Sequence, residues 1–161
     1  MDRKDRALLE ALQADARASL AELGVRIGLS ISATNERIKK LVATRMIRTW
    51  TVRVDAARLG YPMLAFAIVT LRQAANEADF LAAVMAAPEV QECYPLTAPG
   101  TYMLKLRTRD AVHLDVIVQD LLRAIPSVME TQISIVRTIA KDGEYIPCLP
   151  PEAAADLRTA G

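Results

Sequence analysis

The sequence is poor in the residues that build catalytic and cofactor sites. It has two cysteines, one histidine and six glycines in 161 residues. Cys93 and Cys148 are too few and too far apart to predict a disulfide framework or a zinc site. The glycines form no phosphate-binding loop, and the acidic residues form no group at metal-ligand spacing. We therefore expect neither a metal nor a cofactor.

A catalytic unit that needs histidine would have to use His113, the single histidine of the chain. This residue lies near the start of a predicted helix, with no obvious nucleophile beside it in the sequence. A surface histidine is the better interpretation, and we expect that the protein is not an enzyme.

Long hydrophobic runs are missing as well. No apolar run approaches the roughly 20 residues of a membrane-spanning helix. The first residues, Met1-Asp2-Arg3-Lys4, are too charged to begin a signal peptide. The hydrophobic content of 52% is ample for a core. These features predict a cytoplasmic protein of one domain or two small ones, without a membrane partner.

The net charge is only +1, but positive and negative residues are distributed unevenly along the chain. Residues 1–53 contain 11 Lys and Arg against 6 Asp and Glu, whereas the remainder contains 9 against 13. A basic N-terminal part joined to an acidic part fits a DNA-binding domain fused to a second domain.

Residues 20–47 predict two short helices joined by a tight turn. The apolar face of the first helix consists of Leu20, Leu23 and Ile27. Ser19 and Glu22 have the spacing of a capping box, and Gly28 is placed to end the helix in the left-handed conformation. A second helical pattern begins near Ser32. This arrangement is typical of a helix-turn-helix.

The second helix has an apolar side and a polar side at 100° per residue. The inward positions are Thr34, Ile38, Leu41 and Val42. The predicted DNA-binding residues are Ser30, Ser32, Ala33, Asn35, Glu36, Arg37, Lys39 and Lys40. Small residues near the helix N-terminus allow close approach to base edges, and Arg and Lys reach bases or phosphates. The pattern favours a recognition helix for double-stranded DNA over an ordinary solvated helix, which remains the alternative.

Two flanking segments complete the predicted N-terminal domain, residues 1–54. Residues 5–13 predict a helix whose apolar stripe packs on the helix-turn-helix. Residues 49–54 alternate in polarity and predict a short strand, as in a winged helix-turn-helix. Residues 55–62 contain turn-forming Gly and Pro and predict a linker.

Residues 63–146 predict a ferredoxin-like βαββαβ domain, so the fold class is α+β. The expected order is strand 64–71, helix 77–87, strand 90–96, strand 102–107, helix 111–125 and strand 128–140. The first strand is apolar on both faces, but two helices cover only one face of such a sheet. We therefore expect a second copy of the chain to cover the other face in a homodimer. Residues 147–161 predict a tail that is loose or only partly helical.

The chain resembles the Lrp/AsnC (feast/famine) family of bacterial transcription regulators. The segments that carry the resemblance are Asp2-Arg3-Lys4-Asp5, Leu8-Leu9, Leu12-Gln13, Asp15, Arg17, Ala21-Glu22-Leu23, Gly28-Leu29-Ser30, Arg37-Ile38-Lys39-Lys40-Leu41 and Ile47. Ile31 stands where the family often has proline. The resemblance implies a sequence-specific transcriptional regulator that responds to a small-molecule effector such as an amino acid. It also implies dimers that pair sheet to sheet and often assemble further, commonly to octamers.

The predicted effector region departs from the family. Its turn between the second and third strands typically has the sequence Gly-Asp-x-Asp-Tyr. The matching positions here are Ala98, Pro99, Gly100, Thr101 and Tyr102. Both carboxylates are missing, and an amino-acid ammonium is costly to bury without an acceptor. We expect an effector region formed by Thr97, Ala98, Pro99, Gly100, Thr101 and Tyr102 with Thr131 and Ile133. It would bind standard amino acids weakly or prefer a less cationic ligand, and a plain hairpin turn is the alternative.

Two other classes of function fit the sequence less well. Sirohaem decarboxylases resemble the same two-part architecture and hold a tetrapyrrole in the C-terminal half. Their chemistry depends on histidines, and this chain has one. A stand-alone ligand-binding or scaffolding module would leave the basic helix-turn-helix half unexplained.

Overall fold

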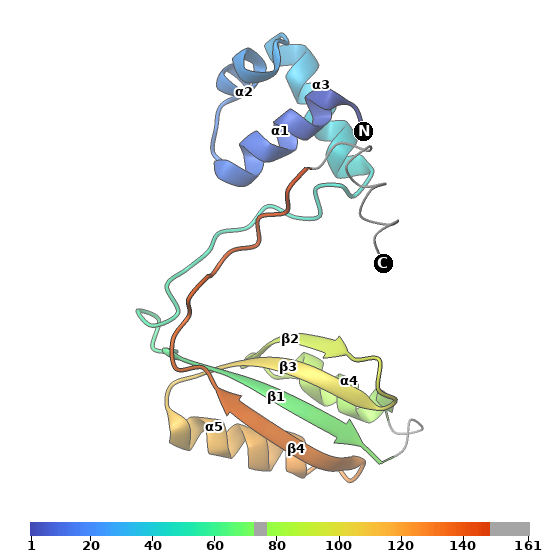
Figure 1. Ribbon diagram of the computed structural model, residues 1–161, viewed down its shortest axis with the longest axis vertical. Helices are drawn as coiled ribbons and strands as arrows, with labels where there is room; N and C mark the ends of the chain where they lie inside the picture. The colour runs from blue at the N-terminus through green and yellow to red at the C-terminus, as the bar shows by residue number, and fades with distance from the viewer. Residues whose placement is uncertain (73–76, 149–161) are drawn as a thin grey trace. The chain divides into compact units, whose positions relative to one another are not determined.

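The computed structural model describes residues 1–72 and 77–148, which form two compact units (Figure 1). The first unit comprises Met1–Val52 together with the chain from Asp142 on, and the second comprises Arg53–Lys141. The side-chain amide of Gln13 donates to the carbonyl of Ile146 (2.9 Å) and accepts from its N–H (2.8 Å). These two hydrogen bonds tie residues 142–148 to the first unit. The predicted tail beyond residue 148 lies outside the described residues.

The described residues of the first unit form three helices: α1 (Arg3–Ala14), α2 (Leu20–Ile27) and α3 (Ile31–Ala43). The predicted helix-turn-helix is thereby confirmed, including the capping box of Ser19 and Glu22 at the start of α2. The buried residues of its core are Leu8, Ala11, Leu12, Leu23, Ile27 and Leu41. Of the inward positions expected in α3, Val42 is the exception, since its side chain is 42% exposed. Val42 lies in the last turn of α3 and does not belong to the buried core of this unit.

The predicted wing strand at residues 49–54 is wrong. Among the described residues, no strand lies between α3 and β1 (Met63–Leu71). Trp50, Val52 and Val54 are exposed. A strand needs a backbone neighbour to which it can hydrogen-bond, and alternating polarity alone does not supply one.

The second unit has the predicted βαββαβ order. After β1 come α4 (Glu77–Ala86), β2 (Val90–Pro95), β3 (Thr101–Thr108), α5 (Ala111–Ile117) and β4 (Val128–Ile135). The helix α5 continues into a π-helical segment, η2 (Val118–Arg123). The sheet order is β2-β3-β1-β4, and all neighbouring strands are antiparallel. The last strand ends at Ile135, earlier than the expected residue 140.

The two faces of this sheet differ in their covering. Ala65, Ala67 and Val69 of β1 are fully buried in one core with residues of α4, α5 and η2. The alternate residues Phe66 and Ile68 are only half-buried. Side chains alternate across a strand, so these two lie on the opposite face, which we call the open face. Their cross-strand partners on β3 are Lys105 and Met103.

Candidate DNA interface and effector region

The start of α3 is held by its own polar side chains. The Ser30 hydroxyl accepts a hydrogen bond from the Ala33 N–H (3.2 Å) and caps the helix. The buried Thr34 hydroxyl donates to the Ser30 carbonyl (2.9 Å). Such bonds satisfy backbone groups that a helix end otherwise leaves unpaired. The first turn of α3 is therefore ordered while its outer side stays accessible.

The turn before α3 depends on two glycines. Gly28 has a φ of 64° and ends α2 in the left-handed conformation. Gly24 lies so close to the turn that an added Cβ would be 2.7 Å from the carbonyl oxygen of Leu29. A larger residue at Gly24 would push the turn, and α3 with it, away from α2.

The predicted DNA-binding residues of α3 fall into two groups. Ser30, Ser32, Glu36, Lys39 and Lys40 are exposed, and Ala33 and Asn35 are partly exposed. Lys39 and Glu36 form an ion pair of 2.8 Å in which both side chains remain exposed. Such surface pairs contribute little to stability and break easily. These seven residues can be reached by a ligand from solvent.

Arg37 is different, because its guanidinium is bound within the protein. Its Nη1 lies 2.7 Å from Asp2 Oδ2 and 2.6 Å from Asp5 Oδ1. The hydrogen bonds it donates to Asp2 and Asp5 raise the pKa of Arg37 further above its usual value. The N–H of Asp5 and the guanidinium of Arg37 both lower the pKa of the Asp2 carboxyl. We expected Arg37 on the outward side, free to reach DNA, but the structure gives it two carboxylate partners on α1.

The first turn of α1 thus contacts both helices of the helix-turn-helix. Asp2 and Asp5 form the capping box of α1 and also bind Arg37 on α3. Lys4 Nζ donates to the carbonyl of Gly28 (3.0 Å), at the end of α2. We call Asp2, Lys4, Asp5 and Arg37 the polar clamp. No sequence signal predicted it, because its partners are 24 to 35 residues apart.

The predicted effector turn is a tight hairpin that satisfies its own backbone. The Leu96 N–H donates to the Thr101 carbonyl (2.8 Å), and the Thr101 N–H donates to the Ala98 carbonyl (3.1 Å). Gly100 has a φ of 64°, and an added Cβ would lie 3.2 Å from the Leu71 carbonyl oxygen. Thr97, Ala98 and Pro99 are exposed at its tip.

The structure does not bring the rest of the predicted effector residues to this tip. Tyr102 is 3% exposed and packs against Phe80, with ring centroids 4.8 Å apart. Thr131 is paired with Val69, which also pairs with Tyr102, so both lie on the helix-covered face. Ile133 packs against the same core. Because that face is filled by α4 and α5, these three residues do not line a shared opening with the turn.

Sequence analysis missed a carboxylate beside Tyr102. The Tyr102 hydroxyl donates a hydrogen bond to Glu77, in the first turn of α4. Burial, followed by the contact with Glu77, raises the pKa of Tyr102 to about 12. Its hydroxyl therefore stays protonated at neutral pH. The 25 residues that separate the pair explain why no local pattern revealed it.

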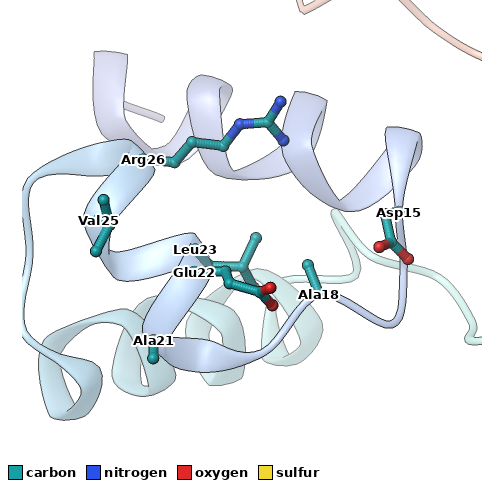
Figure 2. A pocket seen from close by; sticks show the side chains of 7 residues that line it. All are labelled: Asp15, Ala18, Ala21, Glu22, Leu23, Val25 and Arg26. Carbon is teal, nitrogen blue, oxygen red and sulfur yellow. The ribbon is translucent and has the colours of Figure 1, made fainter.

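A cavity of about 530 Å³ lies beside α2 in the first unit (Figure 2). Its side chains come from the end of α1, the following loop and α2. They are Asp15, Ala18, Ala21, Glu22, Leu23, Val25 and Arg26. None of them belongs to α3, so this hollow is separate from the predicted DNA-binding residues.

Within residues 1–72 and 77–148, no group of three or more His, Cys, Asp or Glu side chains is placed to hold a metal ion. In the same part of the chain, no helix is long and apolar enough to cross a membrane.

Comparison with known proteins identifies the family. Residues 1–42 match the AsnC-type helix-turn-helix domain, and residues 64–146 match the Lrp/AsnC ligand binding domain. The chain is 36% identical over 149 residues to the transcriptional regulator AzlB of Bacillus subtilis, which covers 91% of this chain and 95% of AzlB. It is 30% identical over 147 residues to the HTH-type transcriptional regulator LrpA of Mycobacterium tuberculosis, which covers 91% of this chain and 97% of LrpA.

Solved structures agree with this assignment. A transcriptional regulator of Neisseria meningitidis in complex with L-Met has a TM-score of 0.86 and 29% identity, covering 91% of this chain and 96% of that one. AsnC of E. coli has a TM-score of 0.83 and 26% identity, covering 90% and 97%. The chain belongs to the Lrp/AsnC family of transcriptional regulators.

Proposed function

We propose that the protein binds double-stranded DNA through the N-terminal half of α3. The exposed, polar start of this helix carries the proposal, because small side chains and a free helix N-terminus fit the approach to base edges. The proposed contacts are Ser30, Ser32, Ala33, Asn35, Glu36, Lys39 and Lys40. Lys40 is the strongest candidate, since it is exposed and, among the described residues, has no ion-pair partner.

Arg37 has a positioning role in this proposal. Its guanidinium would have to leave Asp2 and Asp5 before it could reach a base or a phosphate. Two charge-assisted hydrogen bonds of 2.6–2.7 Å oppose that step. Arg37 instead holds α3 against the start of α1 and thereby sets the angle at which the exposed residues meet DNA.

The salt dependence of binding separates the two roles. A phosphate contact that is lost lowers the slope of log affinity against log salt by about one unit. We expect Lys40→Ala to lower this slope in a gel shift with the protein's own upstream DNA. We expect Arg37→Ala to weaken binding with an unchanged slope and to lower the thermal midpoint.

Arg123→Ala is the matched control, because Arg123 is an exposed cation at the end of η2 in the second unit. Its affinity and slope should equal those of wild type. A wild-type slope for Lys40→Ala would contradict the recognition-helix assignment. A reduced slope for Arg37→Ala would show a direct phosphate contact and contradict the positioning role.

We further propose regulation by a small-molecule effector. Two relatives support this: the Neisseria meningitidis regulator and the feast or famine regulatory protein of M. tuberculosis are both described in complex with L-methionine. The turn at residues 97–102 lacks the two carboxylates typical of the family, so we expect it to bind free amino acids weakly. Calorimetry against the twenty standard amino acids, combined with alanine at Thr97 and Thr101, tests the turn.

The remaining parts of the proposal concern the oligomeric state, the location in the cell and the absence of catalytic activity. The half-buried apolar residues of the open face support a homodimer that pairs sheet to sheet, with further assembly such as an octamer. The relatives are transcriptional regulators, which supports a cytoplasmic protein without catalytic activity. Nothing in the described residues favours the sirohaem decarboxylase alternative over this function.

A further inference from the structure

We propose that the turn after α3 forms a second DNA contact, in which Arg45 and Arg48 bind phosphates of the DNA backbone. The inference rests on the proposed DNA binding by the N-terminal half of α3 and extends it to a separate part of the chain. Neither arginine belongs to α3, which ends at Ala43. Sequence analysis assigned neither of them to DNA.

Arg45 has a backbone conformation that arginine rarely adopts. Its φ is 56°, and among the described residues it is the one non-glycine residue with a positive φ. The left-handed conformation brings Cβ close to the following carbonyl oxygen, so this position after a helix is usually glycine or asparagine. The protein has an arginine where glycine would be less strained. Local strain of this kind is concentrated at functional sites.

The turn that contains Arg45 is held by its own hydrogen bonds. The Arg45 N–H donates to the Val42 carbonyl (2.9 Å), and the Ile47 N–H donates to the Leu41 carbonyl (3.0 Å). The Ile47 side chain packs against the buried core of the first unit. These contacts fix the path of the backbone that carries Arg45 and Arg48. The left-handed conformation therefore belongs to an ordered turn.

Both arginines are exposed and lie in a stretch without negative charge. Between Glu36 and Asp55 the sequence contains six Lys and Arg and no acidic residue. In the described part of the chain, no carboxylate pairs with the guanidinium of Arg45 or Arg48. This differs from Arg37, which is bound in the polar clamp. Because neither guanidinium has to leave a partner, a phosphate can bind it without that cost.

The length of α3 places this turn beside the major groove when the start of the helix is inside it. The helix has 13 residues, which corresponds to a length of about 20 Å. The major groove is only about 12 Å wide. A helix that enters the groove with its N-terminal residues thus brings its other end towards the phosphates at the edge. The planar guanidinium of arginine binds phosphate by paired hydrogen bonds.

A purely structural role is the competing explanation. The C-terminal end of a helix carries partial negative charge, and cations near it stabilise the helix. If that were the role of Arg45, its removal would destabilise the first unit and leave the salt dependence of DNA binding unchanged. A phosphate contact predicts that stability and DNA affinity change in opposite directions when glycine replaces Arg45.

The test measures the salt dependence of DNA binding by the full chain, with the protein's own upstream DNA and an unrelated duplex of equal length. Arg45→Gly and Arg48→Ala should each lower the slope of log affinity against log salt by about one unit, and the double variant by about two. The loss should be equal on both duplexes, because phosphates carry no direct sequence information. Arg45→Lys retains the charge and should retain the wild-type slope.

Thermal melting provides a second readout. Arg45→Gly should raise the thermal midpoint by a few degrees, because glycine adopts a positive φ without steric cost. A variant that is more stable and binds DNA less tightly has not lost affinity through a damaged fold. Arg123→Ala is the matched control, since it removes an exposed arginine from the second unit. Its slope should equal that of wild type on both duplexes.

Three outcomes overturn the proposal. They are wild-type slopes for both Arg45→Gly and Arg48→Ala, a lower thermal midpoint for Arg45→Gly with an unchanged slope, and a loss of affinity confined to the upstream DNA. Lys40→Ala, measured in the same series, separates this inference from the proposed function. A lower slope for Lys40→Ala alone would retain the recognition helix and refute the second contact. Lower slopes for the arginine variants alone would support the second contact and contradict the recognition-helix assignment.

Discussion

The two units of this protein use charged residues in different ways. In the first unit, charges connect the helices: Asp2 and Asp5 hold Arg37, and Lys4 caps α2. In the second unit, an apolar core connects sheet and helices, and the pair Glu92–Lys105 (2.8 Å) lies on the open face. Small domains bury little apolar surface, so polar contacts contribute more to fixing the orientation of the helices in the first unit. A basic residue on the second helix of a helix-turn-helix is therefore not automatically free to contact DNA.

Neighbouring residues of β1 differ in a comparable way, because one is buried in the core and the next lies on the open face. Val69 is fully buried beneath the helices, and Ile68 is half-buried on the open face. We expect Val69→Asp to unfold the second unit, because an unpaired buried charge costs several kcal/mol. Ile68→Asp should leave the unit folded but produce a monomer.

Thermal melting and light scattering together test this largest effect. Val112→Asp is the control, since Val112 is 75% exposed on α5 and should change neither fold nor mass. An oligomer of unchanged mass for Ile68→Asp would refute the sheet-to-sheet dimer.

Tight packing in the first unit predicts an intermediate effect. Gly24→Ala should destabilise it by roughly 1–3 kcal/mol, the usual cost of forcing extra atoms into a packed site. The reason is the 2.7 Å approach of the added Cβ to the Leu29 carbonyl oxygen. DNA affinity should fall as well, because the turn positions α3.

Gly143→Ala provides a matched control for denaturant unfolding. Gly143 belongs to the same unit, and a Cβ there meets nothing within 4 Å. Its midpoint should match that of wild type. Equal midpoints for both variants would mean that the turn can shift without cost and that the first unit does not need glycine at position 24 for its stability.

The smallest expected effect is the pH dependence of the polar clamp. The folded-state pKa of Asp2 is lowered from its ordinary value of 3.8. A group with a depressed folded pKa stabilises the protein above its unfolded pKa, and this contribution is lost as pH falls through the folded pKa. Asp2→Asn keeps a residue that can cap α1 but removes the charge.

Thermal melts of wild type and Asp2→Asn between pH 6 and pH 2 measure the clamp. The variant should melt lower at pH 6, and the gap should close as pH falls below about 4, the range in which an ordinary Asp takes up a proton. A gap that stays constant would show that the charge of Asp2 does not stabilise the first unit.

Local sequence signals predicted the helices and the four strands of the sheet, but they also predicted a strand at residues 49–54 that does not form. Ser19, Glu22 and Gly28 predicted the bounds of α2 because capping involves neighbours within one turn. The βαββαβ order followed from periodicity and turn residues, and the family comparisons confirm the class. The sequence did not determine whether Ile68 or Val69 faces the helices, since both are apolar.

Only the tertiary structure decided what depends on residues far apart in the chain. Arg37 lies 35 residues from Asp2 in sequence, and Gln13 lies 133 from Ile146. Pairing of that kind depends on how whole helices and segments pack, which no local pattern encodes. Tyr102 was assigned to an effector region by its position in a family turn, and Thr131 was added from the last strand, but the strand register turns both towards the core. The sequence by itself determined the helices and the order of elements in the βαββαβ unit, because those follow from hydrogen bonding and polarity between near neighbours. The fold determined which charges are free to bind DNA or a ligand, because that depends on partners that only packing brings together.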